Sequence, residues 1–460
     1  MVNFFLPILS GVLMSGAFAP IALWWLAPIS LALHIFSLSN SSRPFLNTFL
    51  FAVVFNAISL QWTNIFVGSI PWIILFCGQA VLFMPLGFCK KIGIGFYPLI
   101  FLILEQVRLL FPFGGFGWLR LAYSQADAPY SQIAAIGGAS ALSALVLSIA
   151  LVLYSLLKSR FTLLPLLPIA LLLLPIDVKN VGEIRAVMVQ GNVARLGLDF
   201  NERATEVFFN HVRETEKALA IDKNVDFILW PENAVDVDPF TNTKVGEALN
   251  FFAKPLIIGA VIRKNQELLN TSILWQRGSQ NIYVKQHLTP FGEYIPLRAI
   301  ASKVSPLADT VEDFTPGTSS KVFTLNGAKI APIICYELID DALISRAARN
   351  SQLLVVQTNS ATFGKSPQNA QQIAITRIRA IEYARDILSV STTGVSAFID
   401  HRGKIQMQTE PYLSAHLFAN PALMVGQTPR DRAGDWALVG SLIWLLICAR
   451  LYRRGHEYRR

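Results

Sequence analysis

The sequence predicts an α-helical membrane bundle of eight spans joined to a mixed α/β domain. Hydrophobic residues make up 53% of the 460 residues and charged residues only 15%, a balance typical of membrane proteins. The charges are uneven: residues 1–177 contain seven Lys or Arg and three Asp or Glu, whereas residues 178–433 contain 27 and 25. The apolar runs therefore lie at both ends of the chain, with a polar domain between them.

Stretches with few or no charges locate the eight spans. About 20 residues are needed to cross a bilayer as a helix. The motif Ala17-Phe18-Ala19 resembles a signal-peptidase site, but no basic segment precedes it, so we expect the first helix to be retained. The spans are expected in residues 1–42 and 44–89 (two each), about 93–112, 128–157, 161–177 and about 434–452.

Basic residues between the spans predict the orientation of the chain. Cytoplasmic loops are enriched in Lys and Arg, and the loops after spans two, four and six, together with the tail, are basic. We therefore expect both termini in the cytoplasm and three parts: a seven-span domain 1–177, an extracytoplasmic domain 178–433 and a final span with its tail, 434–460. The basic residues are Arg43, Lys90, Lys91, Lys158, Arg160, Arg450, Arg453, Arg454, Arg459 and Arg460.

One predicted span contains two charges. Glu105 and Arg108 are three residues apart and share a helix face. One interpretation is a mutually neutralising pair that faces the interior of the bundle, and the other is a contact with a lipid headgroup.

Residues 178–433 alternate between strand and helix patterns, which predicts a sheet covered by helices. Apolar strands are expected at 183–190, 226–230, 321–324, 329–335 and 353–357, three further strands before Lys285 and three short ones ending near Met407. Helices are expected at 201–221, 340–350 and 368–385, with one more after residue 230. Residues 288–320 form a long irregular stretch that is rich in Pro and Gly.

Cys335 is the candidate nucleophile. It ends the apolar run Ile330-Ala-Pro-Ile-Ile and is the only one of four cysteines in the polar domain, so it has no disulfide partner there. A cysteine in such a strand is more often ordinary core. A free thiol outside the cytoplasm is, however, a liability unless it is buried or used, and a nucleophilic thiol needs a base or a nearby positive charge.

Two residues at other strand ends supply those groups. Glu232 follows the strand 226–230 and is a candidate base, although loop carboxylates are commonly structural. Lys285 ends another strand and would stabilise a thiolate and later an oxyanion, although a lysine there is usually only solvated. Glu293 would orient Lys285 or pair with it, and His287 is the nearest histidine for a Cys–His dyad but fits no such local signature.

Taken in this order, the motifs resemble the Glu–Lys–Cys triad of the nitrilase superfamily. With the flanking spans, nearly the whole chain resembles the apolipoprotein N-acyltransferase family, the membrane-embedded branch of that superfamily. The motifs are Trp230-Pro-Glu232, Lys285 with Pro290-Phe-Gly-Glu293-Tyr294, Cys335-Tyr336-Glu337, Gln190-Gly-Asn192, Thr358-Asn359, Phe363-Gly-Lys-Ser366, Arg377-Ile-Arg379-Ala-Ile-Glu382, Gly117-Trp118 and Ala122-Tyr123-Ser-Gln125.

The chain departs from the family pattern at several positions. The usual Asn-Asp-x-Trp-Phe is Asn359-Ser360-Ala-Thr362-Phe363 here, a Gln-His pair is Gln371-Gln372, an Asn-Asn-Gly turn is Thr392-Thr393-Gly394, and a tryptophan expected after Gln190-Gly-Asn192 is missing, with Phe200 the nearest aromatic residue. We expect none of these positions to touch the triad, and all of them to affect only substrate packing or rate.

The resemblance implies an α–β–β–α sandwich and a two-step acyl transfer. Glu232, Lys285 and Cys335 would be catalytic, the backbone N–H of Tyr336 would help to bind the oxyanion, and Glu293 and Glu337 would position them. The donor would be a phospholipid, with phosphatidylethanolamine favoured, and the acceptor a diacylglyceryl-cysteine lipoprotein at the outer face of a bacterial inner membrane. The segment 288–320, with Ile295, Leu297, Ile300 and Leu307, is either a lid that dips toward lipid or an ordinary packed loop.

Two other functions use the same features. A membrane-anchored amidase of the nitrilase type needs the triad but only one anchor, and a transporter or receptor needs the spans but not the triad. The sequence shows no basic patch with interleaved aromatic residues, which is the pattern that would predict nucleic-acid binding. The six histidines show no ligand spacing, so neither a metal nor a cofactor is expected.

Overall fold

The computed structural model describes residues 4–158, 163–193, 200–277, 279–304, 309 and 311–457. The chain divides into two compact units, Met1–Ile176 with Thr428–Arg460, and Asp177–Gln427. Each unit is described by itself. Four residues named in the sequence analysis, Arg160, Leu307, Arg459 and Arg460, lie outside the described residues.

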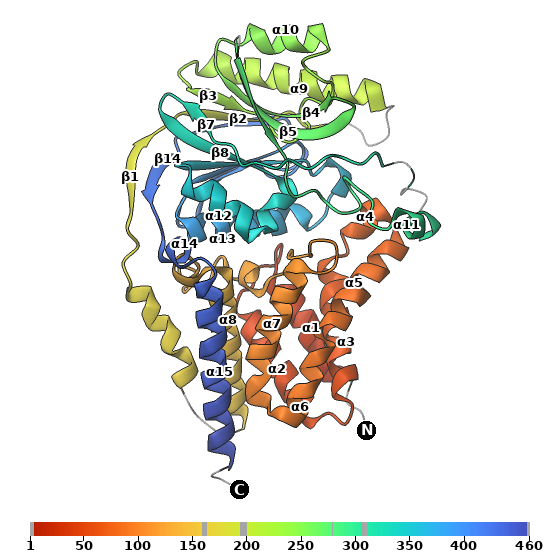
Figure 1. The fold of residues 1–460 in the computed structure, drawn as a ribbon, viewed down its shortest axis with the longest axis vertical. Coiled ribbons are helices and arrows are strands. Elements are labelled where there is room, and N and C mark those ends of the chain that lie inside the picture. Colours follow the sequence, from red (N-terminus) through yellow and green to blue (C-terminus); the bar gives the residue numbers. More distant parts are fainter. Residues whose placement is uncertain are drawn as a thin grey trace. The chain divides into compact units, whose positions relative to one another are not determined.

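The first unit is helical (Figure 1). Each of the eight predicted spans contains a helical segment, and short 3₁₀ turns (Met84–Phe88, Ile94–Phe96, Leu121–Gln125) connect some of them. The segments are α1 (Phe5–Ala17), α2 (Leu26–Asn40), α3 (Pro44–Ser59), α4 (Thr63–Val67), α5 (Ser69–Phe83), α6 (Cys89–Ile92), α7 (Tyr97–Leu110), α8 (Ile133–Leu157), the 3₁₀ helix Leu164–Leu173, α14 (Pro429–Ala433) and α15 (Trp436–Glu457).

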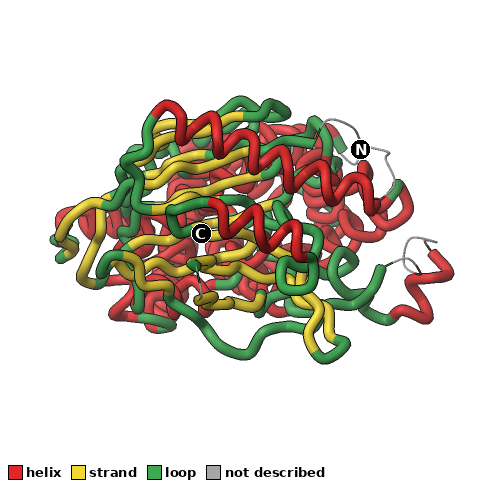
Figure 2. The backbone as a smooth tube through the Cα atoms, turned by 90° about the horizontal axis from the view of Figure 1, so that it is seen from above, coloured by secondary structure: helices red, strands yellow, loops and turns green. Residues whose placement is uncertain are grey.

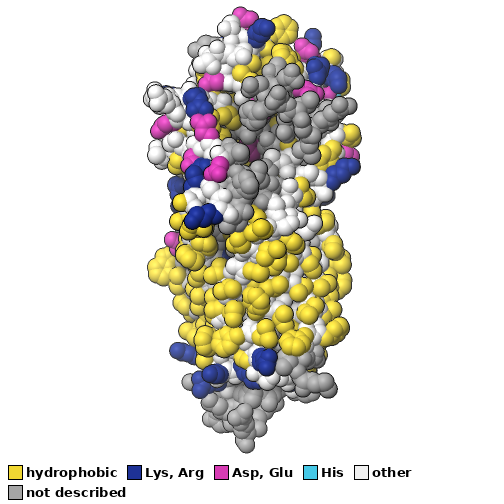
Figure 3. Space-filling view, turned by 90° about the vertical axis from the view of Figure 1, so that its right-hand side faces the viewer, with side chains coloured by type: hydrophobic (Ala, Val, Ile, Leu, Met, Phe, Trp, Pro, Cys, Tyr) yellow, Lys and Arg dark blue, Asp and Glu magenta, His cyan; other side chains and the backbone are white. Residues whose placement is uncertain are grey.

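Three continuous helical stretches are long and apolar enough to cross a membrane: Ser69–Ile92, which joins α5, the turn Met84–Phe88 and α6, together with Ile133–Leu157 and Trp436–Arg453. Four more are apolar but have only 10–17 residues. Among the described residues, length and composition therefore support three spans directly rather than eight. Figure 3 shows a broad band of hydrophobic side chains on one face of this unit, with Lys and Arg side chains at one end.

The two charges of the fifth predicted span are buried, but among the described residues they do not form an ion pair with each other. Oε1 of Glu105 instead accepts the backbone N–H of Leu121 at 2.7 Å, and Nε of Arg108 donates to Oε1 of Gln79 at 2.5 Å. The side chains thus face the interior, as the first interpretation states, and neutral partners take the place of mutual pairing.

The second unit is built on two six-stranded sheets (Figures 1 and 2). The first has the order β13-β2-β3-β4-β5-β6 and the second β12-β11-β10-β9-β8-β7. The first contains Ala415–Ala419, Ala186–Gln190, Phe227–Leu229, Leu256–Lys264, Glu267–Gln276 and Ser279–Val284 in that order. The second contains Ile405–Gln408, Ala397–Ile399, Ile387–Ser391, Leu353–Thr358, Ala328–Ile334 and Phe323–Leu325; β1 (Val178–Glu183) pairs separately with β14 (Ala422–Gly426).

Helices cover the outer face of each sheet and give an α–β–β–α sandwich. The helices α9 (Phe200–Ile221) and α10 (Thr243–Phe251) lie on the first sheet, and α12 (Asp341–Arg349) and α13 (Gln368–Tyr383) on the second. Strand β2 shows why: Ala186 and Met188 join the core between the sheets, whereas Val187 and Val189 join the core beneath α9. This alternation is the period-two pattern of a strand buried on both faces.

The described elements differ from the predicted ones at two places that matter. Strand β8 ends at Ile334, so Cys335 begins a 3₁₀ turn, Cys335–Ile339, instead of ending the strand. Strands β13 and β14 lie beyond Met407, where the sequence analysis placed the last strand. The irregular stretch after residue 288 contains a short helix, α11 (Arg298–Val304).

Candidate active site

Strand direction brings the predicted site residues to one edge of the sandwich. In the first sheet β2, β3 and β4 are parallel, and two antiparallel pairings return β6 to the same direction. In the second sheet β8, β9 and β10 are parallel. Glu232 follows β3, Lys285 follows β6 and Cys335 follows β8, so the carboxyl ends of strands from both sheets supply the site.

Glu232 is held at its position by close backbone packing. Trp230 is fully buried and its indole N–H donates to Oγ1 of Thr215 at 2.9 Å, which fixes the end of β3. The next turn lies directly on Gly259 of β4, where a Cβ atom would come within 2.3 Å of the Pro231 carbonyl oxygen and 2.5 Å of Cα of Glu232. Any larger residue at this position would push the Glu232 backbone away from the sheet.

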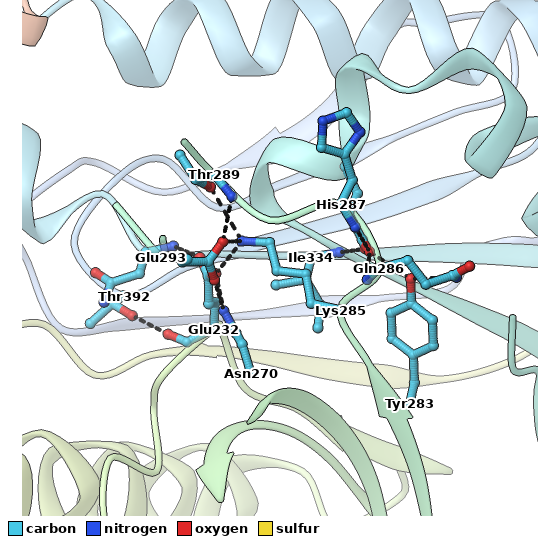
Figure 4. A network of polar contacts seen from close by, with 12 residues as sticks. Glu232, Asn270, Tyr283, Lys285, Gln286, His287, Thr289, Glu293, Ile334 and Thr392 are labelled. Carbon is cyan, nitrogen blue, oxygen red and sulfur yellow. Dashed lines mark hydrogen bonds and ion pairs between the residues drawn. The ribbon is translucent and has the colours of Figure 1, made fainter. Parts of the chain in front are cut away.

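Lys285 lies between two buried carboxylates (Figure 4). Its Nζ is 3.2 Å from Oε1 of Glu232 and 2.7 Å from Oε2 of Glu293. Glu293 also accepts the backbone N–H of Thr289 at 2.7 Å, so the loop after β6 folds back onto the lysine. The structure therefore places Glu293 next to Lys285, as predicted, and the lysine side chain is only 1% exposed.

Cys335 has an unusual backbone conformation for a residue with a side chain. Its φ is +48°, in the left-handed region that is uncommon for non-glycine residues and concentrates at functional sites. The half-buried thiol lies close enough to Glu232, Lys285 and Glu293 for the charges of all three side chains to act on it. The structure thus brings Glu232, Lys285 and Cys335 together.

The electrostatics of this cluster favour a neutral thiol and a charged lysine. Burial and the Glu232 carboxylate raise the pKa of Cys335 well above its ordinary value, against the opposing effect of Lys285. Burial by itself would lower the pKa of Lys285, but the carboxylates of Glu232 and Glu293 outweigh it and raise that pKa. Lys285 in turn lowers the pKa of Glu293 despite its burial. The resting thiol must therefore lose its proton to a base before it can attack.

Glu337 connects the nucleophile turn to the segment that carries Lys285. Its Oε2 accepts the backbone N–H of Ile334 at 2.7 Å, and its Oε1 accepts the Tyr283 hydroxyl at 2.7 Å and the backbone N–H of Gln286 at 2.7 Å. Burial raises the pKa of Glu337 to about 7, although these hydrogen bonds oppose the rise. These contacts join the strand end before Cys335 to the segment that carries Lys285.

Two other residues named from the sequence lie beside this turn. The ring of Tyr336 packs edge-on against His287, with centroids 5.4 Å apart. Nδ1 of His287 is 3.0 Å from Oδ2 of Asp340. His287 is therefore paired with an aspartate, and no hydrogen bond between His287 and Cys335 is found in the described part of the chain.

One departure from the family pattern does contact a triad residue, so that expectation was wrong. Oγ1 of Thr392 donates to the backbone carbonyl of Glu232 at 3.2 Å. Ser360 lies nearby, with its Oγ 3.4 Å from that of Ser391, and Oε1 of Gln372 accepts a hydrogen bond from Gln368. Thr392 reaches Glu232 because β10 and β3 end at the same edge, a cross-sheet relation that the sequence does not reveal.

Two hydrogen-bond donors to Glu232 were not predicted from the sequence. Nδ2 of Asn270 donates to Oε1 of Glu232 at 2.9 Å and to Oε1 of Glu293 at 2.6 Å, and the backbone N–H of Asn359 donates to Oε2 of Glu232 at 2.9 Å. The available signal was an amide side chain in the apolar strand Leu268-Leu269-Asn270-Thr271-Ser272-Ile273. A buried Asn in such a strand needs polar partners.

Arg379 supports the nucleophile turn from the opposite side. It is fully buried on α13, and its Nε donates to the carbonyl of Leu338 in the turn at 2.8 Å. Its remaining nitrogens contact Asp341 at 2.6 Å and Glu382 at 2.5 Å. Arg379 thus ties α12 and α13 to the turn that begins at Cys335.

Known protein families match the two units separately. The model of the carbon–nitrogen hydrolases matches residues 189–412 and that of the apolipoprotein N-acyltransferase N-terminal domain matches residues 10–152. A CN-hydrolase superfamily protein from Xanthomonas campestris is 16% identical, with a TM-score of 0.39 over 57% of this chain and 97% of its own. Nit3 of Saccharomyces cerevisiae, a member of branch 10 of the nitrilase superfamily, has the same identity and score over 56% and 95%.

The sandwich and its family-model match place residues 189–412 in the carbon–nitrogen hydrolase class of domain. Curated relatives specify the branch. The apolipoprotein N-acyltransferase of Mycolicibacterium smegmatis is 32% identical over 91% of this chain and 80% of its own length, and that of Haemophilus influenzae is 27% identical over 97% and 94%. The chain belongs to the apolipoprotein N-acyltransferase family, and it is an acyltransferase.

Proposed function

We propose that this chain N-acylates lipoproteins by a two-step transfer that passes through a thioester on Cys335. One observation carries the assignment of the residues: the Cys335 thiol, on a left-handed turn, lies within reach of the charges of Glu232 and Lys285, which contact each other at 3.2 Å. A base and a fixed positive charge beside one thiol are what acyl transfer through cysteine requires.

In the first step Glu232 takes the proton of the thiol as the sulfur attacks the sn-1 ester carbonyl of a phospholipid. A carbon–sulfur bond forms and the carbonyl oxygen becomes negative, where Lys285 and the backbone N–H of Tyr336 stabilise it. The carbon–oxygen bond to glycerol then breaks, and the departing oxygen takes the proton back from Glu232. Lysophospholipid leaves, and the acyl chain remains on Cys335 as a thioester.

In the second step the α-amine of a diacylglyceryl-cysteine attacks the thioester. Glu232 accepts a proton from the amine, an amide bond forms, and the carbon–sulfur bond breaks. The thiolate recovers a proton from Glu232, which restores the resting site. The raised pKa of Cys335 supports this order, because the neutral thiol is the resting form and the same base serves both halves.

Both substrates are bilayer-anchored, which gives the helical unit its role. We infer that residues 1–177 and 434–460 form eight spans with both termini in the cytoplasm of a bacterium, and that residues 178–433 lie in the periplasm. The basic loops at Arg43, Lys90 and Lys158 support this orientation. Phosphatidylethanolamine is the donor we favour, and a prolipoprotein or apolipoprotein is the acceptor.

The segment 288–320 is the part of the polar domain that we expect to contact lipid. The side chains of Leu297 and Ile300 are 62% and 61% exposed, whereas Ile295 is buried. Large apolar side chains exposed next to a polar site mark a contact with lipid or protein. These exposed side chains favour a lid that dips toward the outer leaflet rather than an ordinary packed loop.

Intact-mass measurement of purified protein with phosphatidylethanolamine tests the function. We expect an acyl adduct on Cys335 that is lost, with amide formation, when a diacylglyceryl-cysteine peptide is added, and Cys335→Ala is the matched control. No adduct, together with turnover of small amides, would replace this proposal with an amidase. If neither activity appears and Cys335→Ala behaves as wild type in cells, an enzyme at this site is refuted.

A further inference from the structure

Asn270 bridges the same two carboxylates as Lys285, but with uncharged donors. It lies on β5 with a 2% exposed side chain. Its single amide nitrogen donates to Oε1 of Glu232 at 2.9 Å and to Oε1 of Glu293 at 2.6 Å (Figure 4). Because an amide nitrogen carries two hydrogens, each carboxylate receives one of them.

The orientation of this amide follows from its surroundings. The carboxylates of Glu232 and Glu293 both face the nitrogen, whereas Oδ1 of Asn270 has no hydrogen-bond partner among the described residues. A flipped amide would point a carbonyl oxygen at two carboxylates and would lose both hydrogen bonds. The donor orientation is therefore the favourable one.

Counting acceptor positions shows where the base is free. A carboxylate offers about four lone-pair positions, two on each oxygen. On Glu232, Oε1 accepts hydrogen bonds from Asn270 and from Lys285. Among the hydrogen bonds of the described residues, Oε2 accepts one, from the backbone N–H of Asn359. One position therefore remains for the thiol, and it is on Oε2.

We propose that Asn270 is a positioning residue that, together with Lys285, occupies Oε1 of Glu232 and reserves Oε2 as the atom that takes the proton of Cys335. The proton moves from sulfur to Oε2, and the electron pair stays on sulfur for the attack. The inference rests on the proposed function of Glu232 as the base, and it adds the atom that acts and the residue that selects it.

Asn270 has a second effect on the same step. Glu232 and Glu293 are 4% and 8% exposed and share one lysine, so their two negative charges are only partly balanced. The lysine lies closer to Glu293, at 2.7 Å, than to Glu232, at 3.2 Å. The two N–H groups of Asn270 stabilise both carboxylates in place, and without them Glu232 is the one held less firmly.

Full-length Asn270→Ala and Asn270→Ser test the proposal. Asn270→Ala removes both donors, and Asn270→Ser keeps a single short donor. Ser272→Ala is the control, because Ser272 is two residues along the same strand, is fully buried and has been given no role in the site. Two rates are measured between pH 5 and 9: thioester formation from phosphatidylethanolamine by intact mass in a single turnover, and alkylation of Cys335 by iodoacetamide without lipid.

We expect Asn270→Ala to slow thioester formation roughly 10- to 100-fold, the loss typical of a hydrogen bond to a charged group. The acid limb of both rates should move to higher pH, because a carboxylate that loses N–H donors holds a proton more firmly. Asn270→Ser should be intermediate, and Ser272→Ala should match wild type. A purely structural role would lower the thermal midpoint without moving either acid limb.

The outcomes separate this inference from the function on which it rests. If wild type forms no thioester, the acyl-transfer proposal fails, and the alkylation profiles still decide whether Asn270 controls the base. If wild type forms the thioester and Asn270→Ala gives superimposable profiles with both probes, the role of Asn270 is refuted while the function stands.

Discussion

Replacing Glu337 by Gln changes almost no volume and should nevertheless disable the enzyme. Both carboxylate oxygens of Glu337 accept a backbone N–H, that of Ile334 on one side and that of Gln286 on the other. An amide has one acceptor oxygen, so either orientation of the introduced side chain would direct its NH₂ group at a backbone N–H. The substitution leaves one buried donor unsatisfied whichever way the amide turns.

The size of the effect follows from these contacts. An unsatisfied buried donor costs about 1–3 kcal/mol, and the remaining hydrogen bonds lose the added strength of a charged acceptor. A total of about 3 kcal/mol would lower the thermal midpoint by roughly 6–12 °C for a domain of this size. Displacement of the Ile334 strand end by about 1 Å would cost roughly 100-fold in rate, because Cys335 is the next residue.

Tyr283→Phe is the matched comparison. It removes one hydrogen bond to Glu337 but leaves every backbone N–H with its acceptor, so a loss of about 1.5–3 kcal/mol and a smaller loss of rate are expected. Thermal midpoints are measured by intrinsic fluorescence and rates by single-turnover thioester formation. If Glu337→Gln retains activity within about threefold of wild type, the argument from acceptor geometry is refuted.

Two further outcomes follow from the site. Glu232→Gln should slow thioester formation at least about 100-fold. It should also lower the pKa of the Cys335 thiol, because it removes the neighbouring anion that raises that pKa. A pH series of alkylation would show more thiolate at neutral pH, and an unchanged thiol pKa would contradict this electrostatic account. Arg379→Met should destabilise the protein by about 3–5 kcal/mol, the usual result of breaking a buried ion pair, and it leaves the Leu338 carbonyl without this donor. The control, Arg346→Met on the exposed face of α12, should leave the thermal midpoint nearly unchanged. Equal midpoints for the two variants would contradict the role of Arg379 as support of the turn that begins at Cys335.

The parts of the fold that depend on local sequence could be predicted. Apolar runs broken by charges placed a helical segment in each of eight regions, and strand ends placed Glu232, Lys285 and Cys335, because a buried strand has a readable pattern. Strands β13 and β14 were missed, since β13 pairs with β2 more than 200 residues earlier and only that pairing makes it a strand. Long-range partners are absent from a local pattern.

The same limit applies to the site. The sequence identified the charged residues but not Asn270, whose role depends on the register that brings β5 beside the loop of Glu293. It also placed Cys335 inside a strand, because five apolar residues precede it and nothing in a cysteine side chain signals a positive φ. The error is informative, because a cysteine with a positive φ is held in that conformation by its surroundings and not by its own backbone preference.

Glu232, Lys285 and Cys335 come from two different sheets, and this explains why so many buried polar contacts surround them. Glu232 and Lys285 extend from one sheet and Cys335 from the other, so a small slide of the sheets would change the distance between base and thiol. The core between the sheets is apolar, and apolar contacts have little directional preference. Directional contacts must therefore set the alignment.

Hydrogen bonds cross from one sheet to the other at this edge. Gln357 on β9 donates to the carbonyl of Trp230 at 2.7 Å, the N–H of Asn359 and the hydroxyl of Thr392 reach Glu232, and Glu337 accepts the N–H of Gln286. Each would weaken steeply as its donor and acceptor move out of line. Together they hold Glu232 and the Cys335 thiol in register, and we propose that this alignment is what the sandwich contributes to acyl transfer.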